Sequence, residues 1–175
     1  EPTFGGINLE DIKAPECFYI EKKLRERCKI PVFHDDQHGT AIITAAAVLN
    51  GLRLIGKEIG EVKLVCSGAG AAAIACLDLL VALGMKRANM TVCDSKGVIY
   101  QTREDRARMD ESKVRYAIED NGQRTLADAV AGKDIFLGLS SANVLKVDML
   151  KQMNSQPLVF ALANPQPEIW PPEAK

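Results

Sequence analysis

The segment Val62-Lys63-Leu64-Val65-Cys66-Ser67-Gly68-Ala69-Gly70-Ala71-Ala72-Ala73 runs from apolar side chains directly into a glycine turn. Residues 62–67 predict a short buried strand, and the Ala- and Leu-rich residues 71–84 predict a helix. Gly68 permits a tight turn, Gly70 lets the backbone approach a pyrophosphate, and Ala73 is small enough for the helix to pack on the strand. The N-terminus of the helix would face the phosphate charge. This segment therefore predicts a dinucleotide-binding turn.

Three further apolar runs follow the glycine turn, separated by segments with helical periodicity or turn residues. These runs are residues 90–93, 134–137 and 158–162. Strands that alternate with helices predict a parallel sheet covered on both faces. Because crossover connections are right-handed, the predicted fold class is α/β, with a doubly wound, mostly parallel sheet of the Rossmann type.

The rest of the chain gives weaker signals. Upstream of the turn, residues 15–28 and 39–55 have helical patterns, and residues 30–33 between them read as extended. Residues 101–112 are the most charged stretch, which we interpret as a solvated loop or helix face.

Composition and charge bear on the class of protein. Hydrophobic residues make up 47% and charged residues 26%, which predicts a packed globular fold. The net charge of −1, with Lys and Arg spread along the chain, predicts no nucleic-acid partner. The run of near-membrane length, residues 64–85, is broken by Gly68, Gly70 and Asp78, so we expect no membrane partner. Five cysteines without a Cys-x-x-Cys pair predict reduced thiols and a cytoplasmic location.

An acidic residue is expected at the end of the strand after the glycine turn, where it would hold the adenosine ribose. Asp94, after residues 91–93, occupies that position. The alternative is a Gly/Ala-rich turn of a domain that binds no nucleotide, with Asp94 as an ordinary turn former. The choice of cofactor stays open, because Asp94 favours the free 2′-hydroxyl of NAD whereas Lys96 would pair with the 2′-phosphate of NADP.

Two pairs of adjacent carboxylates stand at the ends of extended segments, Glu10-Asp11 and Asp35-Asp36. Adjacent carboxylates repel unless a cation or a helix N-terminus compensates them. Each pair alone reads as a helix cap and a solvated turn. Together, beside a dinucleotide-binding fold, they suggest a hard divalent cation held by oxygen ligands.

Five stretches of the sequence resemble the signatures of malic enzymes, in the order in which that family carries them. They are residues 5–11 (Gly-Gly-Ile-Asn-Leu-Glu-Asp), 31–41 (Pro-Val-Phe-His-Asp-Asp-Gln-His-Gly-Thr-Ala), 68–72, 93–97 (Cys-Asp-Ser-Lys-Gly) and 160–165 (Phe-Ala-Leu-Ala-Asn-Pro). The resemblance spans nearly the whole chain, and its Asp-Asp-x-x-Gly-Thr-Ala element is far more specific than the glycine turn.

Residue by residue, the resemblance assigns Glu10, Asp11 and Asp36 as ligands of Mg²⁺ or Mn²⁺. It implies catalytic roles for Asp35, as a carboxylate beside the metal, and for Asn164, near substrate and nicotinamide. The cofactor-binding residues that it implies are Gly68, Ala69, Gly70, Ala71, Ala72, Asp94, Ser95, Lys96 and Asn164. The Asp-Ser-Lys-Gly form of residues 94–97 favours NADP, with NAD as the alternative. His34 and His38 are left out, since hard-cation sites of this kind use oxygen.

The resemblance implies oxidative decarboxylation of malate to pyruvate and CO₂, in a homo-oligomer. We divide the chain into residues 1–36, a metal-ligand segment that leads into the domain, and residues 37–175, a Rossmann-type NAD(P)-binding domain truncated at its C-terminal end. The family's catalytic Lys and Tyr are expected to precede this sequence, so we expect the chain alone to be inactive. Three alternatives remain: a metal-free dehydrogenase, a malolactic enzyme, and a non-catalytic nucleotide-binding module.

Overall fold

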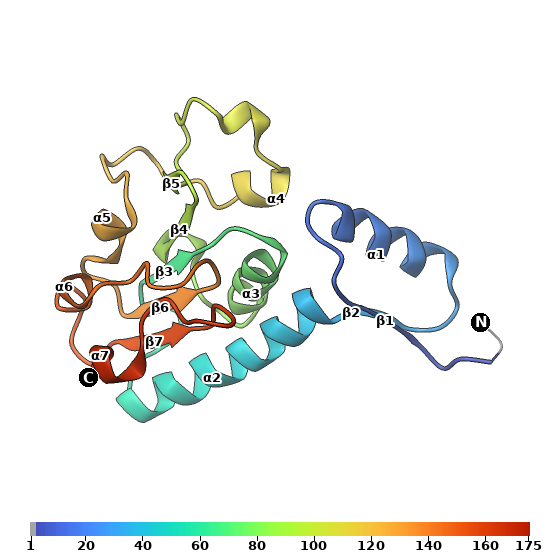
Figure 1. Cartoon of the computed structure of the whole chain (residues 1–175), viewed down its shortest axis with the longest axis horizontal. Coiled ribbons are helices and arrows are strands. Elements are labelled where there is room, and N and C mark those ends of the chain that lie inside the picture. The colour runs from blue at the N-terminus through green and yellow to red at the C-terminus, as the bar shows by residue number, and fades with distance from the viewer. Residues whose placement is uncertain (1–2) are drawn as a thin grey trace.

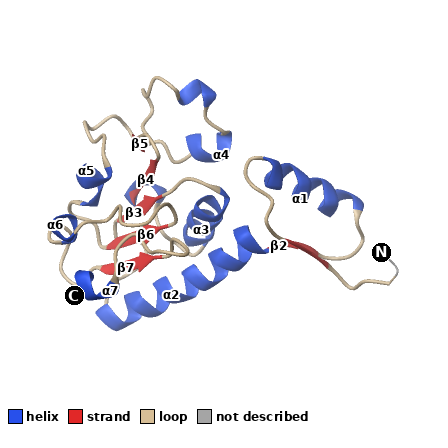
Figure 2. Cartoon of the chain, in the orientation of Figure 1, coloured by secondary structure: helices blue, strands red, loops and turns tan. Residues whose placement is uncertain are grey.

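A computed structural model describes residues 3–175 and shows a three-layer α/β domain with a smaller N-terminal unit beside it (Figures 1 and 2). The central sheet has five strands in the order β5-β4-β3-β6-β7. Its strands are β3 (Leu64–Ser67), β4 (Met90–Asp94), β5 (Gly97–Val98), β6 (Ile135–Gly138) and β7 (Leu158–Ala161). All neighbouring strands are parallel except β4 and β5. The predicted fold class, a doubly wound and mostly parallel sheet, is confirmed.

The order of the strands creates a switch point between β3 and β6. From β3 the chain moves outward to β4 and β5, then returns to the other side of β3 to form β6 and β7. Connections therefore leave β3 and β6 in opposite directions, which opens a crevice at the carboxyl ends of these two strands. The glycine turn follows β3 directly, so the fold places it at this crevice.

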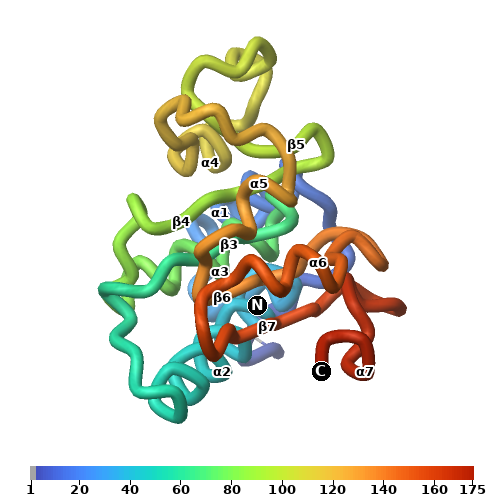
Figure 3. Tube along the Cα trace, turned by 90° about the vertical axis from the view of Figure 1, so that its left-hand side faces the viewer, coloured from blue at the N-terminus to red at the C-terminus, as the bar shows by residue number. Residues whose placement is uncertain are grey.

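Helices cover both faces of the sheet. The helices of the domain are α2 (Thr40–Ile55), α3 (Ala71–Ala82), α4 (Glu111–Val114), α5 (Leu126–Val130), α6 (Val147–Leu150) and α7 (Pro171–Ala174), with the 3₁₀ turns η2 (Arg87–Asn89) and η3 (Arg106–Arg108). Helices α2 and α3 pack together on one face, and α5 and α6 lie on the other. The segment between β5 and α5, which contains α4, projects beyond the β5 edge of the sheet in both views (Figures 1 and 3).

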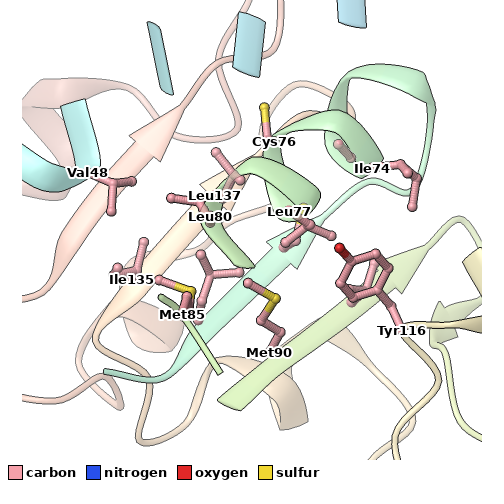
Figure 4. Packing of buried hydrophobic residues seen from close by; sticks show 14 of the residues in the cluster. Val48, Ile74, Cys76, Leu77, Leu80, Met85, Met90, Tyr116, Ile135 and Leu137 are labelled. Atoms are coloured by element: carbon pink, nitrogen blue, oxygen red, sulfur yellow. The ribbon is translucent and has the colours of Figure 1, made fainter. Parts of the chain in front are cut away.

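Successive side chains of the central strands enter opposite core layers. In β3, Leu64 and Cys66 join the cluster under α2 and α3, whereas Val65 joins the cluster under α5. Figure 4 shows Leu77 and Leu80 of α3 packed over the strands, in the first of these layers. Because both faces are buried, the central strands read as continuous apolar runs, which is why the sequence predicted them.

The N-terminal unit is a two-stranded parallel ribbon with one helix. Strand β1 (Ile7–Leu9) pairs with β2 (Val32–His34), and α1 (Glu16–Arg27) connects them. A π-helical turn, η1 (Asp35–Gly39), then leads into α2. The ribbon lies apart from the main sheet, on the side of α3 (Figure 1). The predicted helices over residues 15–28 and 39–55 are confirmed.

The interpretation of residues 101–112 as a solvated stretch was wrong for one residue. Arg103 is 9% exposed and its guanidinium donates to Asp94, which lies at the end of β4. A charged side chain in a loop is buried only where it is paired, and sequence alone did not reveal the partner.

One helical segment, Asp35–Ile55, is long and apolar enough to cross a membrane by length and composition. One of its faces, however, packs in the core through Ala41, Ala45, Val48 and Leu52. Core helices of globular domains meet the same two criteria, so the expected absence of a membrane partner stays a prediction.

Candidate functional site

The carboxyl ends of β3 and β4 border a cleft of about 800 Å³. Its lining residues include the glycine turn (Ser67, Gly68, Ala69 and Gly70), the end of β4 (Cys93, Asp94, Ser95, Lys96 and Gly97), and Ser140 and Ser141 after β6. The structure thus brings most of the residues predicted to bind the cofactor into one cleft. They come from the ends of β3 and β4, which are separated in the sequence by the crossover helix α3. Ala71 and Ala72 follow at the start of α3.

Gly68 is required by the geometry of the turn. Its φ of +115° lies in the region that L side chains rarely adopt, and a Cβ built there would meet the carbonyl oxygen of Leu139 at 2.3 Å. Its N–H donates to the carbonyl of Cys93 on the neighbouring strand at 2.8 Å. Gly70, by contrast, has open space around its Cβ position. The first glycine makes the turn, and the second leaves room over the cleft.

Helix α3 presents its N-terminus to this cleft. Its N-cap, Gly70, supplies no side-chain hydrogen bond to the first turn. The backbone N–H groups of the first turn of an α-helix lack intrahelical acceptors and carry partial positive charge. They are available to a phosphate group in the cleft. Ala73 is 1% exposed, so the third small position serves packing, as predicted.

Asp94 is held by Arg103 in a two-pronged ion pair. Nη1 of Arg103 donates to Oδ1 at 2.9 Å and Nη2 donates to Oδ2 at 2.6 Å, while the backbone N–H of Lys96 donates to Oδ1 at 2.9 Å. Both carboxylate oxygens are therefore engaged. Partial burial acts to raise the pKa of Asp94, but the hydrogen bonds from Arg103 and Lys96 outweigh it and hold the pKa below its ordinary value.

A second carboxylate continues this network toward Lys96. Nε of Arg103 and Nζ of Lys96 donate to the two oxygens of Asp105, each at 2.7 Å. The Lys96 side chain is 67% exposed, so it can leave Asp105 for a ligand, whereas Arg103 is fixed by burial. The end of the cleft at Asp94 is thus bordered by two cations and two carboxylates. Sequence reasoning missed Arg103 and Asp105; their one signal was the charge density of residues 101–112.

We expect Arg103→Met to lower the free energy of unfolding at pH 7 by about 2 kcal/mol, because a half-buried Asp94 loses a charged hydrogen-bond partner. The folded-state pKa of Asp94 is depressed, so its contribution is fully present above the unfolded pKa of about 3.9 and is lost as the pH falls from there through the lower, folded pKa. Urea unfolding at pH 7 and pH 3 tests this. The gap between wild type and variant should narrow at pH 3, and an equal gap at both pH values would contradict the assignment.

Asn164 lies in the exposed loop after β7. Like the glycine turn, this loop follows the carboxyl end of its strand, but Asn164 is not among the residues that line the 800 Å³ cleft. The loop is tied down by Glu168, which is fully buried. Oε2 of Glu168 accepts from the backbone N–H of Ala163 at 3.1 Å, and Oε1 accepts from the backbone N–H of Ser140 at 2.9 Å. Ser140 Oγ in turn lies 2.8 Å from Ser67 Oγ. One carboxylate thus connects the Asn164 loop to the end of β3.

The two acidic pairs meet at one end of the β1-β2 ribbon. Because the strands are parallel and Leu9 pairs with His34, the residues that follow each strand emerge side by side. The backbone N–H of Asp11 donates to Oδ2 of Asp36 at 2.8 Å. The two pairs are 25 positions apart in sequence, so only the ribbon brings them together.

The third predicted ligand is turned elsewhere. Oε1 of Glu10 accepts from Nδ2 of Asn8 at 2.8 Å. Asp35 lies against Gly39, where a Cβ would meet Oδ1 of Asp35 at 2.1 Å. Across residues 3–175, no group of three or more His, Cys, Asp or Glu side chains is arranged to hold a metal ion. The donors have the oxygen chemistry that Mg²⁺ and Mn²⁺ prefer, but the set of three is not assembled in this conformation.

The two histidines beside the acidic pairs differ. His38 Nε2 is 2.7 Å from Oε1 of Glu21, a carboxylate that is 6% exposed. His34 is fully buried, and within the described chain neither of its ring nitrogens has a hydrogen-bond partner. His38 therefore has a hydrogen-bond partner within the described chain, and His34 has none.

The sequence model described as "Malic enzyme, NAD binding domain" matches residues 37–172. Over its full length, the chain is 69% identical to the NADP-dependent malic enzyme of Haemophilus influenzae and 63% identical to an NAD-dependent malic enzyme of Rhizobium meliloti. It superimposes on the crystal structure of the NAD-dependent malic enzyme of Thermotoga maritima with a TM-score of 0.91 at 44% identity, covering 99% of this chain.

The chain spans 23% of the length of the Haemophilus influenzae relative, 22% of the Rhizobium meliloti relative and 46% of the crystallised chain. The family model, the sequence identities and the superposition all indicate a malic enzyme. The glycine turn at the switch point of the sheet is the feature expected of an NAD-binding domain. The chain therefore belongs to the malic enzyme family and carries its NAD-binding domain.

Proposed function

We propose that this chain binds NADP, with NAD as the alternative, within an enzyme that oxidises malate and releases CO₂ and pyruvate. The observation that carries the proposal is the cleft between the N-terminus of α3 and the Asp94 network. Its relatives are named as malic enzymes that depend on NADP or NAD. The hydride acceptor is the nicotinamide ring of the bound cofactor, so this chain's task is to bind and orient it.

The preference for NADP rests on the charges around Asp94. Its two oxygens are already engaged by Arg103 and by the N–H of Lys96, which reduces their capacity to accept both ribose hydroxyls of NAD. Lys96 and Arg103 both line the neighbouring part of the cleft beside Asp94. Lys96 would leave Asp105 and donate a charge-assisted hydrogen bond to the 2′-phosphate of NADP. NAD, without that phosphate, would gain nothing from the exchange.

We expect Lys96→Ala to weaken NADP binding about tenfold, the effect of losing one charged hydrogen bond of about 1.4 kcal/mol, and to change NAD binding far less. Titration calorimetry with both cofactors measures this on one protein sample. Lys146→Ala, which removes an exposed lysine outside the cleft, is the matched control. An equal loss for both cofactors would remove Lys96 from the choice of cofactor.

The proposal includes a Mg²⁺ or Mn²⁺ ion held by Glu10, Asp11 and Asp36. The bond between Asp11 and Asp36 supports it, and Glu10 would have to leave Asn8 to join them. Such an ion supplies charge stabilisation to a developing enolate. Asp35, beside this group, would take part in proton transfer, and the Asn164 amide would orient substrate against the nicotinamide. No Lys or Tyr of this chain is proposed as the general acid or base.

The metal proposal is tested by titrating Mn²⁺ with and without NADP and malate, read by calorimetry. We expect Asp36→Asn to abolish cation binding while cofactor binding stays within about twofold, because the acidic pairs lie outside the cofactor cleft. Binding of Mn²⁺ that is unchanged in Asp36→Asn would refute the ligand assignment.

The remaining proposals concern context. We propose a cytoplasmic protein, supported by five free cysteines of which four are buried. We also propose a homo-oligomeric parent protein without nucleic-acid or membrane partners. Exposed apolar side chains along α2 favour a covered helix face, with Ile43 at 67% and Leu54 at 86% exposure. Sedimentation velocity tests the oligomer.

A further inference from the structure

A basic pocket lies at the amino ends of the strands, whereas the cofactor cleft lies at their carboxyl ends. The amino ends of β4, β3 and β6 are neighbours in the sheet, and each is preceded by a cationic residue. Lys63 stands before β3, Arg87 lies in the 3₁₀ turn before β4, and Lys133 stands two residues before β6. The strand register aligns Leu64 with both Met90 and Ile135, so the three cations emerge at one edge. They line a cavity of about 850 Å³.

Lys133 is the most unusual of the three. Its ammonium is half-buried and donates to the hydroxyl of Thr91, itself 4% exposed, at 2.8 Å. The neighbouring Asp134 is used elsewhere, because its oxygens accept from Lys57, from Asn154 and from the backbone N–H of Lys63. Burial, reinforced by the charge of Lys63, lowers the pKa of Lys133. A half-buried ammonium beside a second one costs free energy unless an anion compensates them.

The three cations of this pocket are not compensated by carboxylates of the described chain. Within residues 3–175, none of Lys63, Arg87 and Lys133 lies within ion-pair distance of a carboxylate. The guanidinium of Arg87 instead lies over the ring of the buried Tyr116, 5.3 Å from its centroid. Arg115, also in the lining, is paired with Asp78. Glu119 is the one acidic residue in the lining.

The pocket has a defined floor. Tyr116 packs against the core beside Met90 and Leu77 (Figure 4). Its hydroxyl donates to Asp78 at 2.5 Å, which fixes the ring on which Arg87 rests. The Thr91 hydroxyl accepts from Lys133 and keeps its own proton to donate. Two ammonium groups, one guanidinium and one hydroxyl therefore border the same space, which is the donor set of a phosphate site.

We propose that this pocket binds a multivalent phosphate group of a small molecule, at a site separate from the cofactor cleft. The cofactor phosphates have their own site at the carboxyl edge of the same strands, so one sheet would carry two anion sites at its two ends. The proposal does not depend on the chemistry proposed above, because none of its residues lines the cofactor cleft.

The test follows backbone amide resonances of the 19.1 kDa chain by NMR during titration with pyrophosphate at about 0.15 M ionic strength. This readout separates the two ends of the sheet. We expect saturable shifts at Lys63, Asn89, Thr91 and Lys133, with a Kd below about 1 mM. Shifts confined to the glycine turn, or shifts that rise linearly without saturation, would overturn the proposal.

Variants sharpen the test. Lys133→Gln keeps a donor for Thr91, and Lys63→Gln changes an exposed side chain, so both should fold. Each should weaken pyrophosphate binding about tenfold, since each removes one charge-assisted hydrogen bond. Lys146→Gln, with the same change of net charge at an exposed position outside the pocket, should leave it unchanged. Equal losses in all three variants would overturn the proposal.

A parallel titration with citrate distinguishes the chemistry of the ligand. A pocket for phosphate should bind pyrophosphate more tightly than citrate under the same conditions. Tighter binding of citrate would overturn the assignment to phosphate.

Discussion

Gly68→Ala should destabilise the domain by about 4 kcal/mol, an effect in the range of a strained backbone combined with a steric clash. Two independent features lead to this figure. The φ of +115° is unfavourable for any residue with a Cβ, and the new methyl would lie 2.3 Å from the Leu139 carbonyl oxygen. That oxygen belongs to backbone after β6, so the clash cannot be relieved by a side-chain rotation. Urea unfolding followed by circular dichroism measures the loss.

Gly70→Ala is the matched control, two residues further on. Its Cβ would enter open space, and its φ of −83° is ordinary. We expect its stability to stay within about 1 kcal/mol of wild type, since a surface-facing substitution without strain has little effect. Cofactor affinity should fall, because the methyl group stands where the backbone approaches a pyrophosphate. A Gly68→Ala protein as stable as Gly70→Ala would show that the turn adapts.

Glu168→Ala should lower the free energy of unfolding by about 3 kcal/mol, because a fully buried carboxylate is removed from three hydrogen-bond donors. The backbone N–H groups of Ser140 and Ala163 would be left without their acceptor. The loops after β6 and β7 would lose their common anchor, so Asn164 would lose its fixed position. Thermal and urea unfolding measure the first effect, and amide exchange at Ala163 measures the second.

Glu168→Gln and Glu173→Ala separate the causes. The glutamine keeps one acceptor oxygen but turns an N–H toward a backbone N–H, so its loss should fall between those of Glu168→Ala and wild type. Glu173 is exposed on α7, and its replacement should change stability by less than about 0.5 kcal/mol. Protection at Ala163 that is unaffected in Glu168→Ala would contradict the anchoring role.

The sheet could be predicted because its central strands are buried on both faces. Such strands appear as short apolar runs, and three of the four predicted runs correspond to β3, β4 and β6. The fourth run corresponds to β7, an edge strand that is half-buried. Two other strands gave little signal. β5 has two residues, and β1 has three residues that are half-buried or exposed. Their pairing is decided by neighbours rather than by their own composition.

The site was predicted in part. The glycine turn and Asp94 could be predicted because each position is defined by the strand or helix next to it in the sequence. Arg103 and Glu168 were missed, because a charged side chain is buried only where it has partners, and these partners lie elsewhere in the chain. Three metal ligands were predicted; the structure brings Asp11 and Asp36 together, while Glu10 bonds to Asn8. The ligand set therefore stays a prediction.

By itself, the sequence determined the α/β class, the dinucleotide turn and the family, because periodicity, glycine conformation and motif order are properties of neighbouring residues. Tertiary structure alone decided which charges pair, that one buried carboxylate holds the Asn164 loop, and that three separate cations gather at the amino edge of the sheet. Those facts depend on distances between segments that are remote in sequence, and such distances are set by how strands align and how helices pack.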